Sequence, residues 1–79
     1  GPEVFPFAIA LEYRIRLDDL RATRAAGPTV RGECDACHCT PRALYDTGVG
    51  EVSYDCGGCL DRRIAVVMSK LRGEAGPNA

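Results

Sequence analysis

Two pairs of closely spaced cysteines are the residues best suited to chemistry in this 79-residue chain. Cys34 and Cys37 form the first C-x2-C pair, Cys56 and Cys59 form the second, and eighteen residues separate the pairs. Zinc prefers four ligands in a tetrahedron, and two residues between cysteines allow a tight turn to direct both sulfurs at one ion. This pattern is typical of structural zinc sites. The sequence therefore predicts one Zn²⁺ per chain, bound by these four cysteines.

Other uses of the cysteines are less well supported by the sequence. Disulfides would leave one of the five thiols unpaired, and no feature marks the chain as secreted. A redox C-x2-C motif would accompany a βαβ pattern, which the sequence lacks. A single iron ion takes the same four thiolates, so the spacing leaves the choice between zinc and iron open.

His38 and Cys39 follow the first pair directly and add two further potential ligands. We expect Cys39 to be a small residue outside the metal shell and His38 to be solvated, because the spacing from Cys34 to Cys37 repeats that of the second pair. Two alternatives stay open. Either residue could replace Cys37 at the metal, or Cys39 could be a reactive thiol beside it, as in a thiol-redox sensor.

The elements that must position the cysteines follow from the pattern of apolar residues. Glycines between β-prone stretches predict a β-hairpin over residues 44–54, between the two cysteine pairs. Residues 60–71 are predicted to form a helix that opens directly from the second pair, ends at Gly73 and is followed by a flexible tail, 74–79. The helix is indicated by an apolar stripe at i, i+4, i+7, i+8 and i+11, formed by Leu60, Ile64, Val67, Met68 and Leu71. We expect this stripe to pack on the N-terminal segment.

The N-terminal segment permits two interpretations. A helix over about 7–26 is favoured by its content of Ala, Leu, Arg and Glu, and Gly27-Pro28 would stop it. The alternative is a strand as far as Leu17 and a short helix capped by Asp18. Residues 1–2 are interpreted as the remainder of an expression tag, and the chain as a domain cut from a longer protein. The expected organisation is a helical segment at 3–28 and a four-cysteine finger with its C-terminal helix at 29–73.

The predicted fold class is a small α+β zinc-binding domain of treble-clef-like order: N-terminal helix, zinc knuckle, β-hairpin and C-terminal helix. With Thr40-Pro41 after the first cysteine pair and a basic helix after the second, the chain resembles GATA-type zinc fingers. The spacing and the preceding helical segment also resemble the zinc finger of DksA-type regulators of RNA polymerase. The resemblance covers residues 33–72 and lies almost wholly in the cysteines. It implies a treble-clef or zinc-ribbon finger that serves bacterial gene regulation.

Charge and hydropathy argue against several classes of function. Ten Lys and Arg stand against eleven Asp and Glu, which argues against a generic nucleic-acid coat or a membrane-surface peptide. No apolar run reaches the roughly 18 residues of a membrane helix, and no signal peptide is visible, so we expect a cytoplasmic protein without membrane contact. A four-cysteine site leaves no open coordination position. We therefore expect neither an enzyme nor a small-molecule substrate.

The favoured function is a non-enzymatic, zinc-stabilised module that binds another protein, with the transcription machinery as the partner that the resemblance implies. Residues 31–59 carry a net charge of −3, which suits a protein partner better than a phosphate backbone. The apolar segment Val4-Phe5-Pro6-Phe7 is interpreted as either a core anchor or a docking strip for the partner. Changes at Phe5, Phe7, Glu51 or Asp55 are expected to impair partner binding. The alternative is a sequence-specific DNA-binding finger that uses the basic side of the C-terminal helix, formed by Arg62, Arg63, Lys70 and Arg72.

Overall fold

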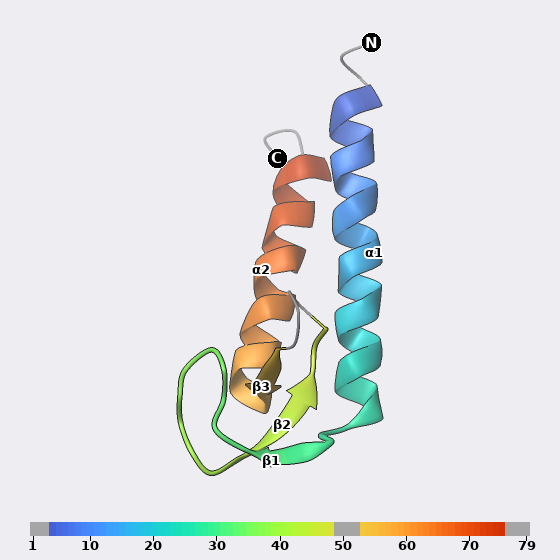
Figure 1. The fold of residues 1–79 in the computed structure, drawn as a ribbon. Coiled ribbons are helices and arrows are strands. Elements are labelled where there is room, and N and C mark those ends of the chain that lie inside the picture. Colours follow the sequence, from blue (N-terminus) through green and yellow to red (C-terminus); the bar gives the residue numbers. More distant parts are fainter. Residues whose placement is uncertain (1–3, 49–52, 76–79) are drawn as a thin grey trace.

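In the computed structural model, two antiparallel helices stand on a small three-stranded sheet (Figure 1). The structure describes the backbone of residues 4–48 and 53–75, and the side chains within 8–48 and 53–73. The elements in chain order are α1 (Val4–Ala26), β1 (Val30–Gly32), β2 (Arg42–Asp46), β3 (Tyr54–Cys56) and α2 (Gly57–Ala75). The described helices and strands confirm the predicted α+β class.

The N-terminal segment is one continuous helix, so the helical interpretation is confirmed and the strand alternative is wrong. The helix ends at Ala26 and is followed by Gly27, whose φ of 86° lies in the left-handed region that glycine adopts without a steric penalty. The Gly27 amide donates to the carbonyl of Arg24 at 3.3 Å, which closes the last turn. Pro28 follows directly and prevents further helix.

The sheet has the order β1-β2-β3 and is antiparallel throughout. Leu44 at the centre of β2 lies opposite Val30 on one side and Cys56 on the other. The pairing of β2 with β3 confirms the predicted hairpin, although residues 49–52 of its connection lie outside the described residues. The first strand was not predicted, because it has only three residues and Val30 is exposed.

The C-terminal helix is longer than predicted at both ends. It starts at Gly57, immediately after Cys56, and it passes Gly73 to reach Ala75. The prediction that Gly73 ends the helix is therefore wrong, and the predicted tail includes two helical residues; residues 76–79 lie outside the described part. Gly57 and Gly58 lie in the first turn of this helix. A Cβ atom added at Gly57 would be at ordinary van der Waals distance from its neighbours, and one added at Gly58 would have no neighbour within 4 Å. A helix start at this place does not need glycine.

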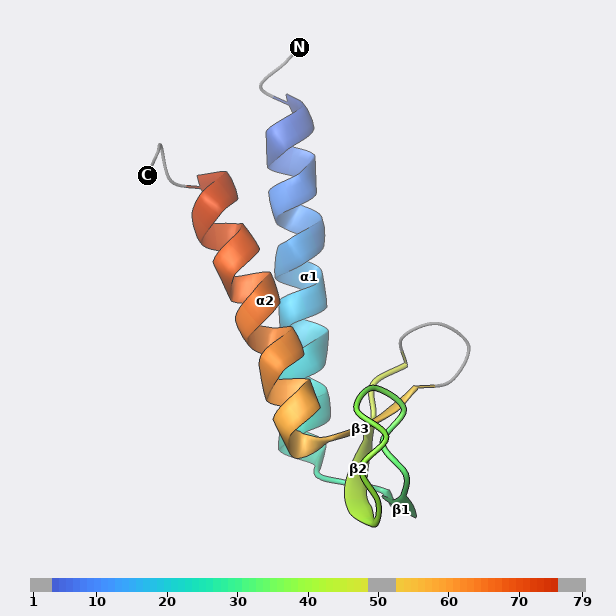
Figure 2. The ribbon, with the colours of Figure 1, turned by 90° about the vertical axis from the view of Figure 1, so that its left-hand side faces the viewer.

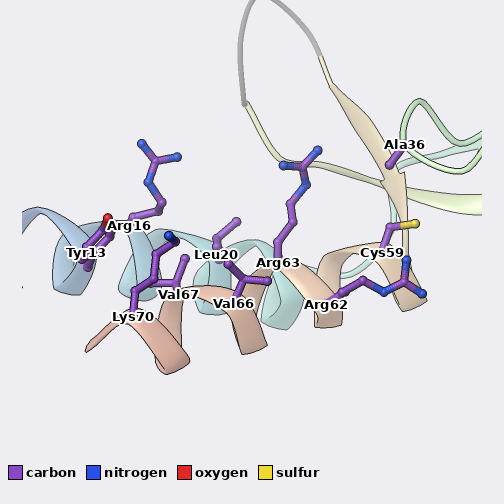
Figure 3. A pocket seen from close by; sticks show the side chains of 10 residues that line it. All are labelled: Tyr13, Arg16, Leu20, Ala36, Cys59, Arg62, Arg63, Val66, Val67 and Lys70. Atoms are coloured by element: carbon purple, nitrogen blue, oxygen red, sulfur yellow. The ribbon is translucent and has the colours of Figure 1, made fainter. Parts of the chain in front are cut away.

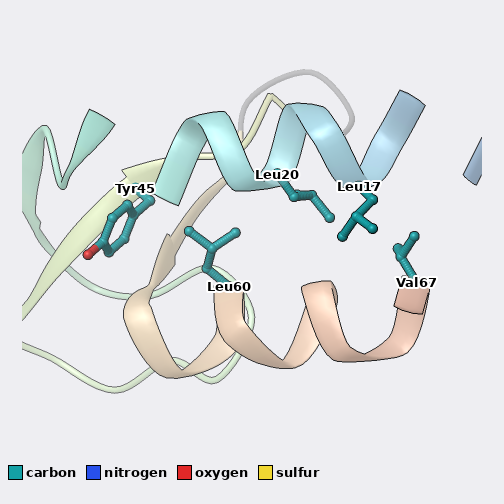
Figure 4. Close-up of a cluster of buried hydrophobic side chains, with 5 residues drawn as sticks. All are labelled: Leu17, Leu20, Tyr45, Leu60 and Val67. Atoms are coloured by element: carbon teal, nitrogen blue, oxygen red, sulfur yellow. The ribbon is translucent and has the colours of Figure 1, made fainter. Parts of the chain in front are cut away.

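The main core lies between the two helices and confirms that the C-terminal helix packs on the N-terminal one (Figure 4). Leu17 and Leu20 of α1 face Leu60 and Val67 of α2, and all four side chains are buried. Tyr45 of β2 completes this cluster and connects the sheet to the helices. The remaining stripe residues pack at its edge and are partly buried: Ile64, Met68 and Leu71.

A group of polar contacts joins the end of α1 to the start of α2 and to the sheet. The Arg24 guanidinium donates to Asp61 at 2.9 and 3.3 Å and also to the hydroxyl of Tyr45. Its charge lies 5.1 Å from the centre of the Tyr45 ring, within the range of a cation–π contact. These contacts hold the end of α1 and the start of α2 against β2.

The molecule is elongated, with extents of 47 × 21 × 20 Å. The sheet lies at one end, whereas the start of α1 and the end of α2 lie towards the other (Figures 1 and 2). Within the described residues, neither helix combines the length and the apolar character that a membrane crossing requires.

Candidate metal centre

The four predicted cysteines form one cluster of sulfur atoms. The Sγ atoms of Cys34, Cys37, Cys56 and Cys59 all lie within 4.8 Å of one another. The pair Cys37 and Cys56 has an Sγ–Sγ distance of 3.9 Å. Four sulfurs at about 2.3 Å from one ion in a tetrahedron would be about 3.8 Å apart. The donor set and its spacing therefore fit a tetrathiolate metal site.

The first cysteine pair is held by a closed turn between β1 and β2. The amide of Cys34 donates to the carbonyl of Cys39 at 3.0 Å, and the amide of His38 donates to the carbonyl of Cys34 at 2.8 Å. Asp35 ties this turn to β3 in two ways. Its amide donates to the carbonyl of Tyr54 at 2.9 Å, and its carboxylate accepts from the amide of Tyr54 at 2.7 Å. Asp35 is a positioning residue that the sequence analysis missed.

The second pair occupies the junction of β3 and α2. Cys56 is the last residue of β3, and Cys59 is the third residue of α2. The amino end of a helix carries a partial positive charge, which favours negative sulfur at this place. Cys34, Cys56 and Cys59 are buried, whereas Cys37 is exposed and forms the solvent side of the cluster.

The surroundings of the sulfurs shift the pKa values of Cys34 and Cys59 in opposite directions. Burial acts to raise the pKa of Cys34, but backbone amides outweigh it and lower the pKa to about 6. Two of these donors are the amides of Cys37 and Cys56, at 3.4 and 3.3 Å from the Cys34 sulfur. Burial together with the neighbouring cysteine side chains raises the pKa of Cys59 to about 12. A divalent cation would offset part of the negative charge of the thiolates and favour their deprotonated form, so metal binding would release protons.

His38 and Cys39 lie outside the sulfur cluster. Cys39 is an exposed free thiol, and it is not part of the four-cysteine group. His38 has a φ of 64°, in the left-handed region, and its Nδ1 atom lies 3.0 Å from a carboxylate oxygen of Glu33. The structure thus brings together the four cysteines that the repeated spacing singled out.

Asp55 has a structural role that the sequence analysis did not assign. Its carboxylate is fully buried, and it accepts hydrogen bonds from the guanidinium of Arg63 and from the hydroxyl of Ser53, the latter at 3.2 Å. Asp55 has no exposed surface with which to contact a partner directly, so a change at Asp55 would act on partner binding through the fold. The pairing also occupies Arg63, one of the four residues predicted to contact DNA.

The other predicted contact residues differ in how they are placed. Arg62, Lys70 and Arg72 are exposed on α2. The amino group of Lys70 lies 5.9 Å from the centre of the Tyr13 ring. The side chains of Phe5 and Phe7, and the whole of Glu51, lie outside the described residues.

Comparison of the chain with profiles of known protein families, with characterised proteins and with solved structures gave no match. The class is therefore defined by the fold and the site alone. The protein is a small α+β domain with two helices, a three-stranded antiparallel sheet and four cysteines placed to hold a metal ion.

Proposed function

We propose that this protein is a non-enzymatic module, stabilised by structural zinc, that binds another protein. The observation that carries the proposal is the composition of the core at the sheet end. Cys34, Cys56 and Cys59 are three of the four residues in the buried hydrophobic cluster there, and Leu44 is the fourth. A metal that joins these sulfurs would take the place of an apolar core, which is the work of a structural site rather than a catalytic one.

Zinc is the favoured metal because it is the usual occupant of closed four-cysteine sites. All five thiols are free, as a reducing compartment such as the cytoplasm would keep them. The resemblance to regulators of transcription supports a bacterial regulatory setting and a partner from the transcription machinery.

A protein partner is favoured over DNA by the charges near the cluster. Arg63 is engaged with Asp55, which leaves Arg62, Lys70 and Arg72 as the exposed cations predicted on α2. Four thiolates on one Zn²⁺ leave a net charge of −2 beside them, which would repel a phosphate backbone. Binding of DNA stays the second candidate, because Arg16 of α1 lies along the same groove as Arg62 and Lys70 (Figure 3).

The test compares both partner classes with one folded protein. Zinc-loaded protein is used to capture proteins from cells at about 150 mM salt, with Cys34→Ser as the control that cannot complete the site. Anisotropy titrations with duplex DNA are run at the same salt. We expect a protein that is retained only by the zinc-loaded chain, and weak DNA binding that fades as salt rises. Sequence-selective DNA binding in the nanomolar range, lost in Arg62→Ala, would reverse the order of the two candidates.

A further inference from the structure

A groove of about 460 Å³ runs along the helix pair from the metal cluster towards Lys70 (Figure 3). Its apolar lining comes from both helices. Leu20 of α1 and Val67 of α2 are buried, whereas Val66 is 47% exposed and reaches into solvent between two cations of its own helix. Val66 is not among the residues of the core beneath, so this side chain offers apolar surface that the described part of the chain does not cover.

Apart from Cys59 at the end next to the metal cluster, the charged side chains around this surface have one sign. Arg16 from α1 and Arg62 and Lys70 from α2 line the groove and are exposed, and none of the three forms an ion pair with another described residue. No aspartate or glutamate of the described residues lines it. The fourth cation, Arg63, is neutralised by buried Asp55. A surface with this charge is complementary to carboxylates.

The spacing on α2 defines what the surface can recognise. Arg62, Val66 and Lys70 follow one another at i, i+4 and i+8, so they lie in a row on one face of the helix. At 1.5 Å per residue, the two cations are about 12 Å apart along the axis, with the apolar side chain midway between them. An amphipathic helix that lays its apolar face in a groove between two helices places its own side chains at the same repeat.

We propose that this groove is the docking site for an acidic amphipathic helix of a partner protein. Apolar side chains of that helix cover Val66 and the groove floor, and carboxylates about two turns apart pair with Arg62 and Lys70. This inference rests on the proposed function as a protein-binding module and assigns it a surface and a partner chemistry. Nucleic acid suits the groove less well, because Tyr13, the one aromatic ring among the described residues that line it, is half-buried and has Lys70 over one face, which limits base stacking.

The probe is a library of random 16-residue peptides displayed on phage and selected on the zinc-loaded full chain. Enriched peptides are synthesised and titrated by fluorescence anisotropy at about 150 mM salt. The groove variant is Arg62→Glu with Lys70→Glu, and Val66→Asp tests the apolar contact. The matched control is Arg14→Glu with Arg31→Glu, which changes the net charge equally at two exposed residues outside the groove. Zinc content and circular dichroism confirm that each variant is folded.

We expect the enriched peptides to combine acidic residues with apolar ones at helical spacing. The groove variant should weaken their binding about tenfold or more, as should Val66→Asp, whereas the control should change it less than about twofold. Peptides without carboxylates, equal weakening by both charge-reversed pairs, or failure to enrich any peptide would overturn the docking site. If enriched peptides bind every groove variant as tightly as the unchanged chain, the groove is not their docking site, and the proposed function as a protein-binding module still stands. Duplex DNA that binds tightly through Arg62 and Lys70, with no peptide enriched, would overturn both.

Discussion

Cys37 and Cys39 are two exposed thiols separated by one residue, yet only Cys37 belongs to the sulfur cluster. We predict that Cys37→Ser loses the stoichiometric zinc, because a hydroxyl replaces one of the four thiolates, and that Cys39→Ser keeps it. Native mass spectrometry counts the metal per chain directly. Zinc retained in Cys37→Ser and lost in Cys39→Ser would mean that the ligand register is shifted by two residues.

The pair of Asp55 and Arg63 has one fully buried member and one partly exposed member. Arg63→Ala leaves the Asp55 carboxylate without a cation in a site that water does not reach, so we expect a loss of about 3–5 kcal/mol in the free energy of unfolding. Asp55→Ala should cost less, about 1–3 kcal/mol, because Arg63 can turn to solvent.

Urea unfolding of the zinc-loaded variants measures both changes. Arg62→Ala, at an exposed position on the same turn, is the matched control and should shift stability by less than about 0.5 kcal/mol. A larger cost for Asp55→Ala than for Arg63→Ala would show that the guanidinium is not what compensates the buried charge.

At this scale, the four clustered cysteines could be predicted and the role of Arg63 could not. Ligand spacing is a local property, since each cysteine pair is set by a single turn. Asp55, the partner of Arg63, lies eight residues away, across the junction of β3 and α2. The Asp55 side chain faces inwards only because of the way these two elements pack. From the sequence alone, Arg63 is one of several charges on a helix surface.

Gly27, directly after α1, and Gly73, inside α2, allow the effect of backbone conformation on stability to be measured apart from side-chain packing. A Cβ atom at Gly27 or at Gly73 would meet nothing within 4 Å, so an alanine at either place acts through the backbone alone. Gly73 lies inside α2, where we predict that Gly73→Ala raises the free energy of unfolding by about 0.5–1 kcal/mol. Gly27 has a φ of 86°, so Gly27→Ala should lower it by about 1 kcal/mol.

Thermal unfolding of the zinc-loaded variants gives the sign of each change. Opposite signs are the expected result. A loss of stability in Gly73→Ala would contradict a helix that continues to Ala75.

Both helices and the hairpin were predictable as elements, because their apolar patterns are long or their turn residues distinctive. The first strand was not, since three residues with an exposed valine carry no periodic signal, and its place depends on pairing with β2. The C-terminal end of α2 was also missed. Glycine often ends helices, but Gly73 does not do so here.

The described residues of the molecule form two hydrophobic clusters, and Tyr45 of β2 belongs to the cluster between the helices. The other cluster consists of three cysteines and Leu44 with Tyr54 packed against it. Metal removal should therefore unfold the sheet end first and release Tyr45 from the helix pair. Because structural zinc contributes on the order of 10 kcal/mol to folding, we predict that the metal-free chain shows no cooperative thermal transition.

Near-ultraviolet circular dichroism reports on the ordered tyrosines, and differential scanning calorimetry reports on the transition. Both signals should disappear in strong chelator and return when zinc is added in excess. A chain that stays folded and metal-free would contradict a structural role for the site.

The start of α1 and the end of α2 lie towards the same end of the molecule, away from the sulfur cluster (Figure 2). Packed helices are about 8–10 Å apart, so polypeptides fused before one helix and after the other would emerge as near neighbours. This geometry suits insertion of the whole domain into a surface loop of a host protein. With a fluorescent host, folding driven by metal at the far end would bring the two insertion points together, and the fusion would report zinc as a change in light emission.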